Sequence, residues 1–444
     1  MKNVLILGAG MVSRPIVRYL LNQPDLFITL ADMVASKAEK IIDNHEQGTA
    51  IFLDISQSDR LEEIVSHADI VVSLLPYAFH AKVARVCINH KKHLVTTSYI
   101  REEMRELDKR AKKAGILLLN ECGLDPGIDH MSAMRVIHQI RKQGGKVTSF
   151  KSTTGALPAH EANTNPFGYK FSWSPRGVLL ASRNPAKWLE EGKVISITGE
   201  QLFEHYYIED VEKVGSFENY PNRNSIAYKD IYGLKDAETV YRGTFRMIGW
   251  CETLKAISQL GWLSEKPLND FSGSTYADLT MKLIDESDKD NLYNQTASYL
   301  GLKPYASVMK RLEWLGLFED KKLSSEKNTP LDHLNVVSLE KMVLQESERD
   351  MIVMHHEFIA EYEDRKEYIT STLLNYGIPG KDSAVSRTVS LPAAIAVKMI
   401  VDGIITTTGC VIPIDPEIYN PILDELETLD IIFMETREPY TKGQ

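Results

Sequence analysis

The chain has 444 residues, of which 43% are hydrophobic and 25% are charged, as is typical of a globular protein. At roughly 150 residues per domain, this length favours two or three domains. The 51 basic and 61 acidic residues give a net charge of −10. That balance argues against a nucleic-acid partner, because phosphate binding needs a basic surface.

The four cysteines are far apart and form no CxxC pair, so we expect neither a zinc motif nor a disulfide scaffold. A reducing, cytoplasmic setting fits this pattern. The apolar start, Val4–Leu7, is too short for a signal peptide. We expect no membrane association, because the sequence has no run of about 18 apolar residues.

Strand-like and helix-like segments alternate over residues 1–145. The expected strands are Asn3–Leu7, Phe27–Ala31, Ala50–Leu53, Ile70–Leu74, His93–Thr97 and Ile116–Asn120. The expected helices are Val12–Leu21, Val34–Asp43, Ser58–Ser66, Ala81–His90 and Glu102–Ala114. This alternation predicts an α/β fold with a doubly wound parallel sheet of the Rossmann type. The strands are continuously apolar, as expected when helices cover both faces.

The pattern changes near residue 146, and mixed α and β signals continue to about residue 261. From residue 276 to about 347 the spacing of leucines predicts helices. We expect strands at Met351–Met354, Glu361–Tyr362 and Glu367–Leu373, and a helix at Ser390–Asp402.

A glycine-rich loop follows the first expected strand. Gly8-Ala9-Gly10-Met11-Val12-Ser13 reads G-x-G-x-x-S, with serine where the dinucleotide-binding motif has a third, closely packed glycine. Gly8 suits the tight turn, and Gly10 lets the backbone approach a pyrophosphate. The next helix offers unpaired N–H groups to the phosphates. The loop therefore predicts a nicotinamide dinucleotide site.

Asp32 ends the second expected strand, at about the usual spacing of 20 residues from the loop. A carboxylate there accepts hydrogen bonds from the adenosine ribose and repels a 2′-phosphate, which favours NAD over NADP. Lys37 is the best nearby cation for such a phosphate, although a solvated helix lysine is the simpler interpretation.

Polar or turn-forming residues follow the expected strands, at the edge where doubly wound sheets bind ligands. They are Gly8, Asp32, Asp54, Pro76-Tyr77, Ser98-Tyr99 and Glu121–Gly123. We expect Asp54 beside the adenine and Pro76 on the path to the nicotinamide.

The segment Gly123–His130 follows the last of these strands. Asp125 precedes a proline, which keeps it out of helical geometry, and we expect it to contact substrate. We expect Asp129 to be the N-cap of the next helix, and His130 to be structural.

Longer blocks of the sequence resemble saccharopine dehydrogenase of the L-glutamate-forming kind, also called saccharopine reductase. The resemblance runs over nearly the whole chain. It is carried by Ser73–Tyr77, Thr97–Ile100, Gly123–Met131, Asn165–Pro175, Tyr220–Ser225, Arg242–Arg246 and Leu391–Ala394.

The resemblance implies three parts and a homodimer. Residues 1–122 would form the dinucleotide-binding Rossmann domain, with residues 386–444 packing back onto it. Residues 123–270 and 348–385 would form a mixed α/β substrate and dimerisation domain, and residues 271–347 a small helical lobe.

The resemblance also implies where ligands bind. Substrate contacts are expected at Ser98, Tyr99, Asp125, Arg223, Thr244, Phe245 and Arg246. Cofactor contacts are expected at Gly8, Ala9, Gly10, Met11, Val12, Asp32, Asp54, Ile55, Leu75, Thr97, Leu124, Asp125, Pro126, Gly127, Ile128 and Ser174. Thr154 stands where many members have cysteine, which puts a catalytic cysteine in doubt. The family includes NAD and NADP users, and Asp32-Met33 resembles the NAD-using animal domain.

The substrate implied is saccharopine, or glutamate plus 2-aminoadipate 6-semialdehyde in the reverse direction. Saccharopine has three carboxylates, which Arg223 and Arg246 would bind through forked donors. Lys170 and Arg176 are weaker candidates, and Arg176 is equally suited to a surface ion pair. Asp125 and Tyr99 are the expected proton-transfer residues. NAD is the expected cofactor, with NADP as the alternative.

Two other functions stay open. One is a related reductive condensation of the carboxynorspermidine or homospermidine type, against which the two arginines argue because a polyamine prefers acids. The other is a non-catalytic cofactor-sensing scaffold, against which Asp125 and Tyr99 argue. His355-His356 reads as a strand end without helically spaced carboxylates, so we expect no metal.

Overall fold

The computed structural model of the chain describes residues 1–268 and 273–441. Contacts divide the chain into two compact units. The first unit contains residues 1–146, 362–364 and 371–436, and the second contains residues 147–361, 365–370 and 437–444. The predicted boundary at residue 122 differs from this division, and the three predicted domain ranges stay a prediction.

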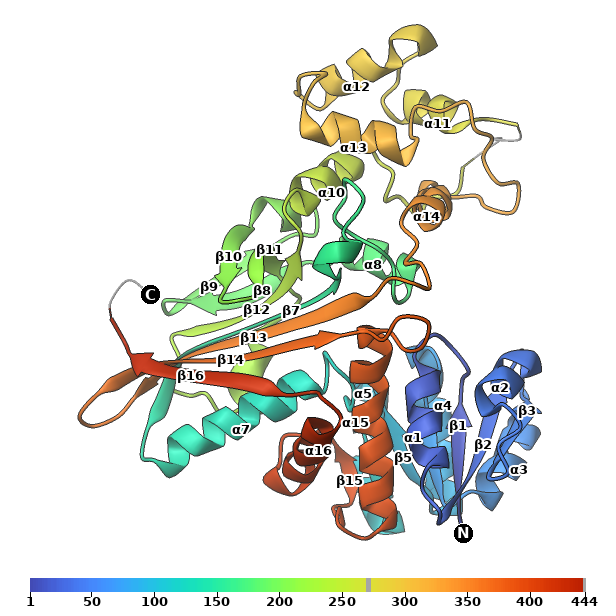
Figure 1. Ribbon diagram of the computed structural model, residues 1–444, viewed down its shortest axis with the longest axis vertical. Coiled ribbons are helices and arrows are strands. Elements are labelled where there is room, and N and C mark those ends of the chain that lie inside the picture. Colours follow the sequence, from blue (N-terminus) through green and yellow to red (C-terminus); the bar gives the residue numbers. More distant parts are fainter. Residues whose placement is uncertain (269–272, 442–444) are drawn as a thin grey trace. The chain divides into compact units, whose positions relative to one another are not determined.

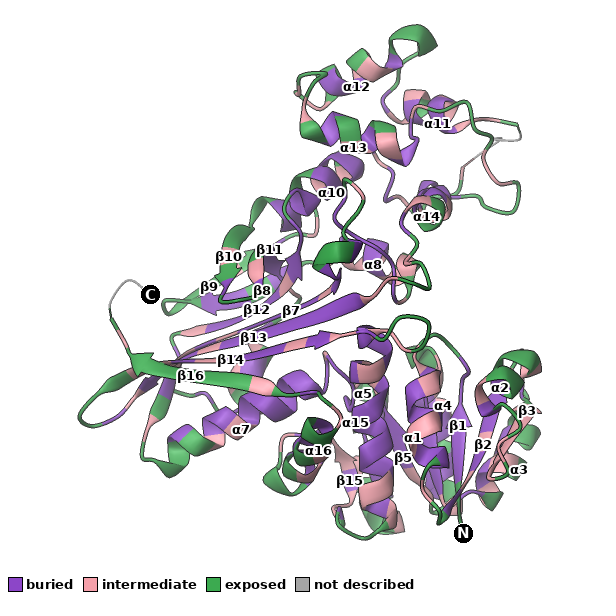
Figure 2. Cartoon of the chain, viewed as in Figure 1, coloured by how far each residue is buried: buried purple, intermediate pink, exposed green. Residues whose placement is uncertain are grey.

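The first unit contains a seven-stranded sheet in the order β15-β6-β5-β4-β1-β2-β3, with every neighbouring pair parallel. Its central strands are buried along their length because helices cover both faces (Figure 2). The Rossmann-type fold class is therefore confirmed. The strands are β1 (Lys2–Leu7), β2 (Leu26–Asp32), β3 (Gly48–Phe52), β4 (Ile70–Ser73), β5 (His93–Thr96), β6 (Leu117–Leu119) and β15 (Gly409–Val411).

Most helices of the first unit pack on this sheet, whereas α16 packs against α15 and α7 (Figure 1). They are α1 (Ser13–Leu21), α2 (Ala35–Ile42), α3 (Ser58–His67), α4 (His80–His90), α5 (Glu102–Arg105), α6 (Asp108–Ala114), α7 (Ile128–Lys142), α15 (Ala384–Val401) and α16 (Pro416–Thr428), with a 3-10 turn at Tyr77–Phe79. The single helix predicted at Glu102–Ala114 is wrong, because the chain breaks between α5 and α6. Met104, Leu107 and Ala111 all pack into one core across that break.

Helix α15 begins six residues before the predicted start at Ser390. Ser383 caps it by accepting a hydrogen bond from the Ser386 N–H, 3.0 Å away. The Thr388 hydroxyl donates to the carbonyl of Ala384, four residues back. These bonds allow hydroxyl side chains inside a buried helix, which hid the helical pattern in the sequence.

Helix α15 is also long and apolar enough to cross a membrane by length and composition, contrary to the sequence expectation that no such segment exists. Of its 18-residue window, 72% is buried inside the structure. It packs against α1, α16, β4 and β5. Its apolar character is thus explained by its place in a protein core.

A second sheet has nine strands, seven of them in the order β10-β11-β12-β7-β13-β14-β16, with β8 and β9 attached beside β12. Strands β14 and β16 have residues in both units. The strands are β7 (Lys146–Pro158), β8 (Ala186–Glu190), β9 (Lys193–Ile197), β10 (Tyr207–Val211), β11 (Gly215–Pro221), β12 (Thr239–Arg246), β13 (Asp350–Glu361), β14 (Lys366–Tyr376) and β16 (Phe433–Pro439).

The second unit also contains helices, and all but α9 share one aromatic and aliphatic core with parts of its sheet. They are α8 (Pro175–Ala181), α9 (Ala227–Ile231), α10 (Trp250–Gln259), α11 (Tyr276–Leu283), α12 (Leu292–Tyr299), α13 (Ser307–Leu315) and α14 (Pro330–Lys341), with 3-10 turns at His160–Ala162, Leu202–Glu204 and Lys289–Asn291. Thr275 and Asp278 form a capping box that starts α11. The separate strand predicted at Glu361–Tyr362 is wrong, because β13 continues from Asp350 to Glu361 through two buried histidines.

Candidate dinucleotide and substrate site

The glycine loop joins β1 to α1 with the geometry that the motif requires. Gly8 has φ +107°, and a Cβ there would meet the Leu74 carbonyl oxygen at 3.2 Å. Both conditions favour glycine. Ser13, at the third motif position, is fully buried, and its hydroxyl donates to the Gly10 carbonyl at 2.6 Å. A small residue is needed there for packing, and serine meets that need.

Neither the backbone conformation nor the packing of the protein itself requires glycine at position 10. A Cβ at Gly10 would meet no atom of the described chain within 4 Å. The first N–H groups of α1 receive no side-chain cap, and no acidic residue lies in its first turn. An open cradle beside uncapped N–H groups fits the pyrophosphate of a dinucleotide.

Asp32 holds the loop and the end of β2 together. Its Oδ2 accepts a hydrogen bond from the Ala9 N–H at 2.7 Å, and its Oδ1 accepts one from the Val34 N–H at 2.8 Å. The carboxylate is therefore fixed in position while oxygen lone pairs remain for a ribose hydroxyl.

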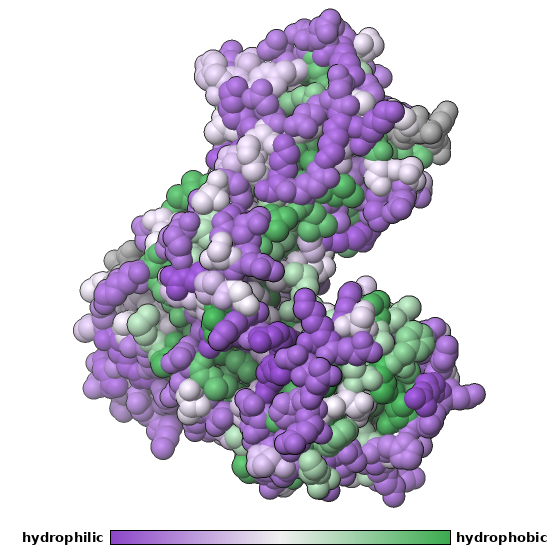
Figure 3. Space-filling view, turned by 45° about the vertical axis from the view of Figure 1, so that its right-hand side comes forward, coloured by the Kyte–Doolittle hydropathy of each residue, from purple (hydrophilic) through white to green (hydrophobic). Residues whose placement is uncertain are grey.

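Exposed apolar side chains surround these strand ends. Met11, Met33, Phe52 and Tyr77 are each more than half exposed. Hydrophobic residues reach the molecular surface among hydrophilic ones in several places (Figure 3). An apolar rim of this kind suits the flat face of a nucleotide base.

Other predicted cofactor residues divide by exposure. Ile55, Leu124 and Ile128 have buried side chains. Asp54 accepts a hydrogen bond from the Ser56 N–H at 2.9 Å, which lowers the pKa of its carboxyl.

The segment after β6 presents Asp125 on a tight backbone hairpin. The Gly123 N–H donates to the Pro126 carbonyl at 3.0 Å, and a Cβ on Gly127 would meet the Gly123 oxygen at 2.1 Å. Only glycine fits this approach. The Tyr99 hydroxyl, which follows β5, donates to Asp125 Oδ1 at 2.7 Å. The two predicted proton-transfer residues are thus in direct contact.

The prediction that Asp129 is the N-cap of α7 is wrong. Gly127 holds that position, and Asp129 lies in the first turn, where its side chain accepts from the Gly127 N–H at 2.6 Å. His130 Nε2 lies 2.6 Å from Glu121 Oε2, and both side chains are buried. The second Glu121 oxygen accepts from the Ile100 N–H at 2.8 Å. Glu121, which the sequence marked only as a strand-end residue, therefore fixes the segment after Ser98 and Tyr99.

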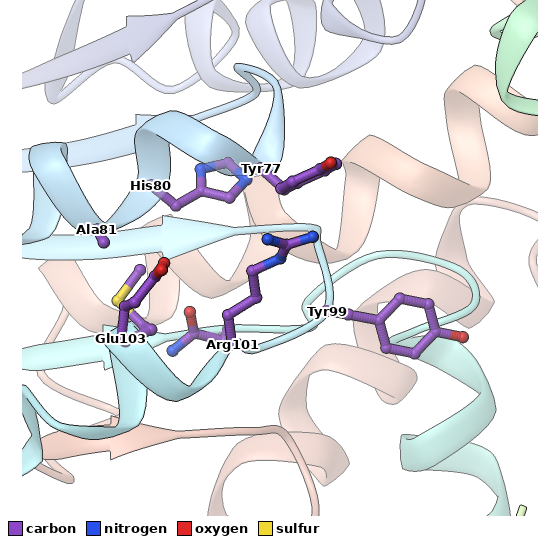
Figure 4. A pocket seen from close by; sticks show the side chains of 8 residues that line it. Tyr77, His80, Ala81, Tyr99, Arg101 and Glu103 are labelled. Atoms are coloured by element: carbon purple, nitrogen blue, oxygen red, sulfur yellow. The ribbon is translucent and has the colours of Figure 1, made fainter. Parts of the chain in front are cut away.

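The sequence did not identify His80 as a candidate, although it lies only three residues after Tyr77. It lines a small hollow with Tyr77, Tyr99 and Arg101 (Figure 4). The Arg101 guanidinium lies 3.7 Å from the centre of the Tyr77 ring. His80 itself bonds to Ser98, one of the predicted substrate residues, at 3.0 Å.

In the second unit, Arg246 ends β12 and is only 5% exposed. Its Nη1 donates to the Phe245 carbonyl at 2.8 Å, and its guanidinium carbon lies 5.2 and 5.5 Å from the ring centres of Tyr169 and Trp250. Within the described chain, Arg246 Nε and Thr154 Oγ1 are buried without a hydrogen-bond partner. Donors left open in this way suit an anionic ligand.

The remaining predicted residues of the second unit lie in different settings. Arg223 has φ +53°, and its carbonyl accepts from the Lys187 N–H at 2.8 Å. Phe245 is fully buried against Phe217, whereas Thr244 is partly exposed on the same strand. Ser174 caps α8.

The two weaker cation candidates of the second unit are in ion pairs. Lys170 is paired with Glu348, and Arg176 lies 3.0 Å from Glu265 and 3.3 Å from Asp332.

One group in the described chain has metal-ligand geometry. Ligand atoms of Glu209, His355 and Glu357 lie within 4.8 Å of one another. His355 lies inside β13 rather than at a strand end, contrary to the sequence interpretation. Glu209 accepts from Asn219 Nδ2 at 2.5 Å, and Glu357 lies 3.7 Å from Lys151 Nζ. The carboxylates thus have protein partners, and the absence of a metal stays a prediction.

Comparisons with known proteins identify the family of the chain. Residues 4–119 match the family described as "Saccharopine dehydrogenase NADP binding domain", and residues 123–431 match "Saccharopine dehydrogenase C-terminal domain". The saccharopine dehydrogenase [NADP(+), L-glutamate-forming] of Schizosaccharomyces pombe is 38% identical over 96% of this chain and 97% of its own. The mitochondrial alpha-aminoadipic semialdehyde synthase of Rattus norvegicus is 35% identical over 97% of this chain but only 47% of its own.

A solved structure also matches. The apo saccharopine dehydrogenase (L-Glu forming) of Saccharomyces cerevisiae superposes with a TM-score of 0.91, at 38% identity over 99% of this chain and 100% of that chain. The fold and the strand-end site define a dinucleotide-binding oxidoreductase. With these matches over both parts of its length, the chain belongs to the saccharopine dehydrogenase family of the L-glutamate-forming kind.

Proposed function

We propose that this protein interconverts saccharopine, NAD and water with L-glutamate, 2-aminoadipate 6-semialdehyde and NADH. The contact of Tyr99 with Asp125, at the carboxyl edge of a dinucleotide-binding sheet, carries the proposal. The names of relatives that match nearly the full chain support the glutamate-forming direction of bond cleavage.

In the forward reaction, the C–H bond on the lysine side of the secondary amine is oxidised, for which a bound dinucleotide would supply the hydride acceptor. The resulting imine adds water, and the carbinolamine collapses to the semialdehyde with release of the glutamate amine. Two proton transfers accompany addition and collapse. The protein's part is to orient the reactants, exclude water and move those protons.

The Tyr99–Asp125 pair suits the proton transfers, since a carboxylate that accepts from a phenol can take a proton and return it. Ser98, which immediately precedes Tyr99 in the sequence, carries a further hydroxyl. For the carboxylates of the substrate, we assign Arg223, Thr244 and Arg246. Arg246 is the best supported, since its buried Nε has no partner within the described residues.

For the cofactor we propose NAD, with NADP as the alternative. Asp32 is held by two backbone N–H groups at the end of β2, where its charge would repel a 2′-phosphate. The next residue, Met33, is exposed and uncharged. The names of the fungal relatives specify NADP(+), so this proposal separates the chain from them.

Absorbance at 340 nm tests the function directly. Saccharopine would be offered with NAD and separately with NADP. We expect both NADH formation with NAD and a kcat/KM that is larger with NAD than with NADP. No signal with either cofactor would overturn the proposal and leave the non-catalytic scaffold. Reduction only with carboxynorspermidine or homospermidine would support the related condensation instead.

We also propose a cytoplasmic homodimer. All four cysteines are described as free thiols, three of them buried, which suits a reducing compartment. Light scattering on the purified protein tests the dimer, and fractionation of the source cells tests the compartment.

A further inference from the structure

His80 is a buried imidazole at the point where two strands of the dinucleotide sheet end. It begins α4 and is 5% exposed. Its Nδ1 lies 2.9 Å from the hydroxyl of Ser73, at the end of β4. Its Nε2 lies 3.1 Å from the hydroxyl of Thr96, at the end of β5, and 3.0 Å from that of Ser98. One ring therefore bonds three hydroxyls (Figure 4 shows its place beside the strand ends).

The three hydroxyls differ in exposure. Ser73 and Thr96 are fully or almost fully buried, whereas Ser98 is only partly buried. Burial lowers the pKa of the imidazole to about 4, so the ring is neutral near pH 7. A neutral imidazole has one donor and one acceptor nitrogen. The ring therefore links the buried hydroxyl of Ser73, on Nδ1, to the partly exposed hydroxyl of Ser98, on Nε2.

The backbone of Ser98 is already fixed by other residues. Its carbonyl accepts from the Glu121 N–H at 3.2 Å, and Glu121 also holds the following segment through the Ile100 N–H. The remaining freedom of Ser98 is rotation of its side chain. The bond to His80 Nε2 removes that freedom.

We infer that His80 is a positioning residue of the reaction, which holds the Ser98 hydroxyl in one rotamer for contact with the substrate. The inference rests on the proposed function, because Ser98 is a substrate residue only within it. If His80 served only to join β4 to β5, its bonds to Ser73 and Thr96 would be sufficient. The third bond leads out of the core.

Two variants separate the two ring nitrogens. In His80→Asn, the amide lies where Nδ1 was, so it can still bond to Ser73 but does not reach Ser98. In His80→Gln, the longer side chain carries its amide to the position of Nε2 and can bond to Ser98. His80→Asn loses the bonds of Nε2 to both Ser98 and Thr96. We expect it to lower kcat/KM for saccharopine about tenfold, the effect of losing the hydrogen bond to Ser98, and His80→Gln to recover most of it. The KM for the dinucleotide should change less than twofold in both.

A double-mutant cycle with Ser98→Ala gives a second readout. We expect His80→Asn to have no further effect on kcat/KM when Ser98 is already alanine. His93→Asn is the matched control, because His93 is a partly buried histidine at the start of β5 whose Nδ1 accepts from the Leu117 N–H at 3.0 Å. It should keep wild-type kinetics, and melting temperatures of all variants show whether they fold.

The outcomes are distinct. Wild-type protein without turnover of saccharopine would overturn the proposed function and this inference with it. An active wild type whose His80→Asn variant keeps its kcat/KM would overturn the inference alone. The same holds if the effects of His80→Asn and Ser98→Ala multiply, or if His80→Gln falls as far as His80→Asn, since the role would then be structural.

Discussion

The candidate residues of the two units are held in different ways. In the first unit, Asp32, Ser98 and Asp125 each have a hydrogen-bond partner from the same unit. In the second unit, Arg246 Nε, Thr154 Oγ1 and Trp250 Nε1 are buried without a hydrogen-bond partner among the described residues. The first unit thus has no such open atom among these three residues, whereas the second unit has buried polar atoms without a partner beside paired ones such as Arg246 Nη1, which donates to the Phe245 carbonyl.

This difference indicates two kinds of preorganisation. Satisfied groups keep a fixed geometry before any ligand arrives, which suits proton transfer and orientation. Buried donors without partners are costly in the free protein, by about 1–3 kcal/mol each, and a ligand that pairs with them recovers that cost. We therefore expect changes in the first set to lower mainly kcat and changes in the second set to raise mainly KM.

The largest effect is expected from Asp125→Asn. An amide cannot accept a proton as a carboxylate does, while its shape preserves the contact with Tyr99. We expect kcat to fall by about 10²–10⁴-fold with a smaller change in KM for saccharopine. Tyr99→Phe, which leaves the carboxylate in place, should fall less. Steady-state rates over a range of pH measure both, and an unchanged pH profile for Asp125→Asn would contradict the role.

A smaller effect, on KM, is expected from Arg246→Met. The variant keeps an apolar chain against Tyr169 and Trp250 but removes the charged donors. A charged hydrogen bond contributes about 1.5–3 kcal/mol, so kcat/KM for saccharopine should fall roughly 10- to 100-fold, mostly through KM. Arg246→Lys, which keeps the charge without the forked donors, should lie between. A loss confined to kcat would contradict the division drawn between the two units.

The sequence predicted what local patterns encode. The G-x-G-x-x-S loop, Asp32 and the row of strand-end residues follow from short-range motifs and from strand alternation, and the structure has the expected strands there. His80 could not be found in this way, because its importance comes from bringing Ser73, Thr96 and Ser98 together across two strands. The role of Glu121 could not be predicted for the same reason, since its partner His130 lies across the Gly123–Gly127 hairpin.

The misread elements have a common physical cause. Buried polar residues interrupt the apolar pattern in β13, at His355-His356, and in the first turns of α15. In α15 a hydrogen bond satisfies the buried hydroxyl, since Thr388 donates to the Ala384 carbonyl, and in β13 the His356 ring packs against Phe150 and Phe358. A pattern read along the chain does not contain those partners.

Glu209 is a buried polar group of the second unit that is not a candidate substrate residue, and one of its oxygens has no hydrogen-bond partner among the described residues. Its effect on the stability of the folded protein can be measured. Burial, and secondly the charge of Glu357, raise the pKa of Glu209 to about 7 from 4.5. In the unfolded chain the carboxyl ionises near 4.5, so the folded state binds more protons between the two values. Stability is therefore lost as the pH rises from about 4.5 to about 7.

We expect Glu209→Gln to be about 2 kcal/mol more stable than wild type at pH 8 and equally stable at pH 4.5. The amide keeps an oxygen for Asn219 and has no charge to bury. Denaturant unfolding at the two pH values measures the difference. Glu212→Gln is the control, because Glu212 lies in the turn of the same hairpin and its side chain is 77% exposed. Equal gains in both variants would point to net charge rather than burial.

The smallest effect is expected at the cofactor end of the first unit, where the satisfied Asp32 can be kept while its surroundings change. Met33→Arg adds a cation beside the ribose site without touching the two backbone bonds of Asp32. We expect it to raise kcat/KM for NADP about fivefold and to leave that for NAD within twofold, because a surface cation in high dielectric gains about 1 kcal/mol from a phosphate. Asp32→Asn removes the charge but disturbs one backbone bond, so it should lower the NAD value as well. If the wild type already prefers NADP, the carboxylate of Asp32 serves only to hold the glycine loop. The difference between the paired candidate groups of the first unit and the unpaired buried atoms of the second would then have no bearing on cofactor choice.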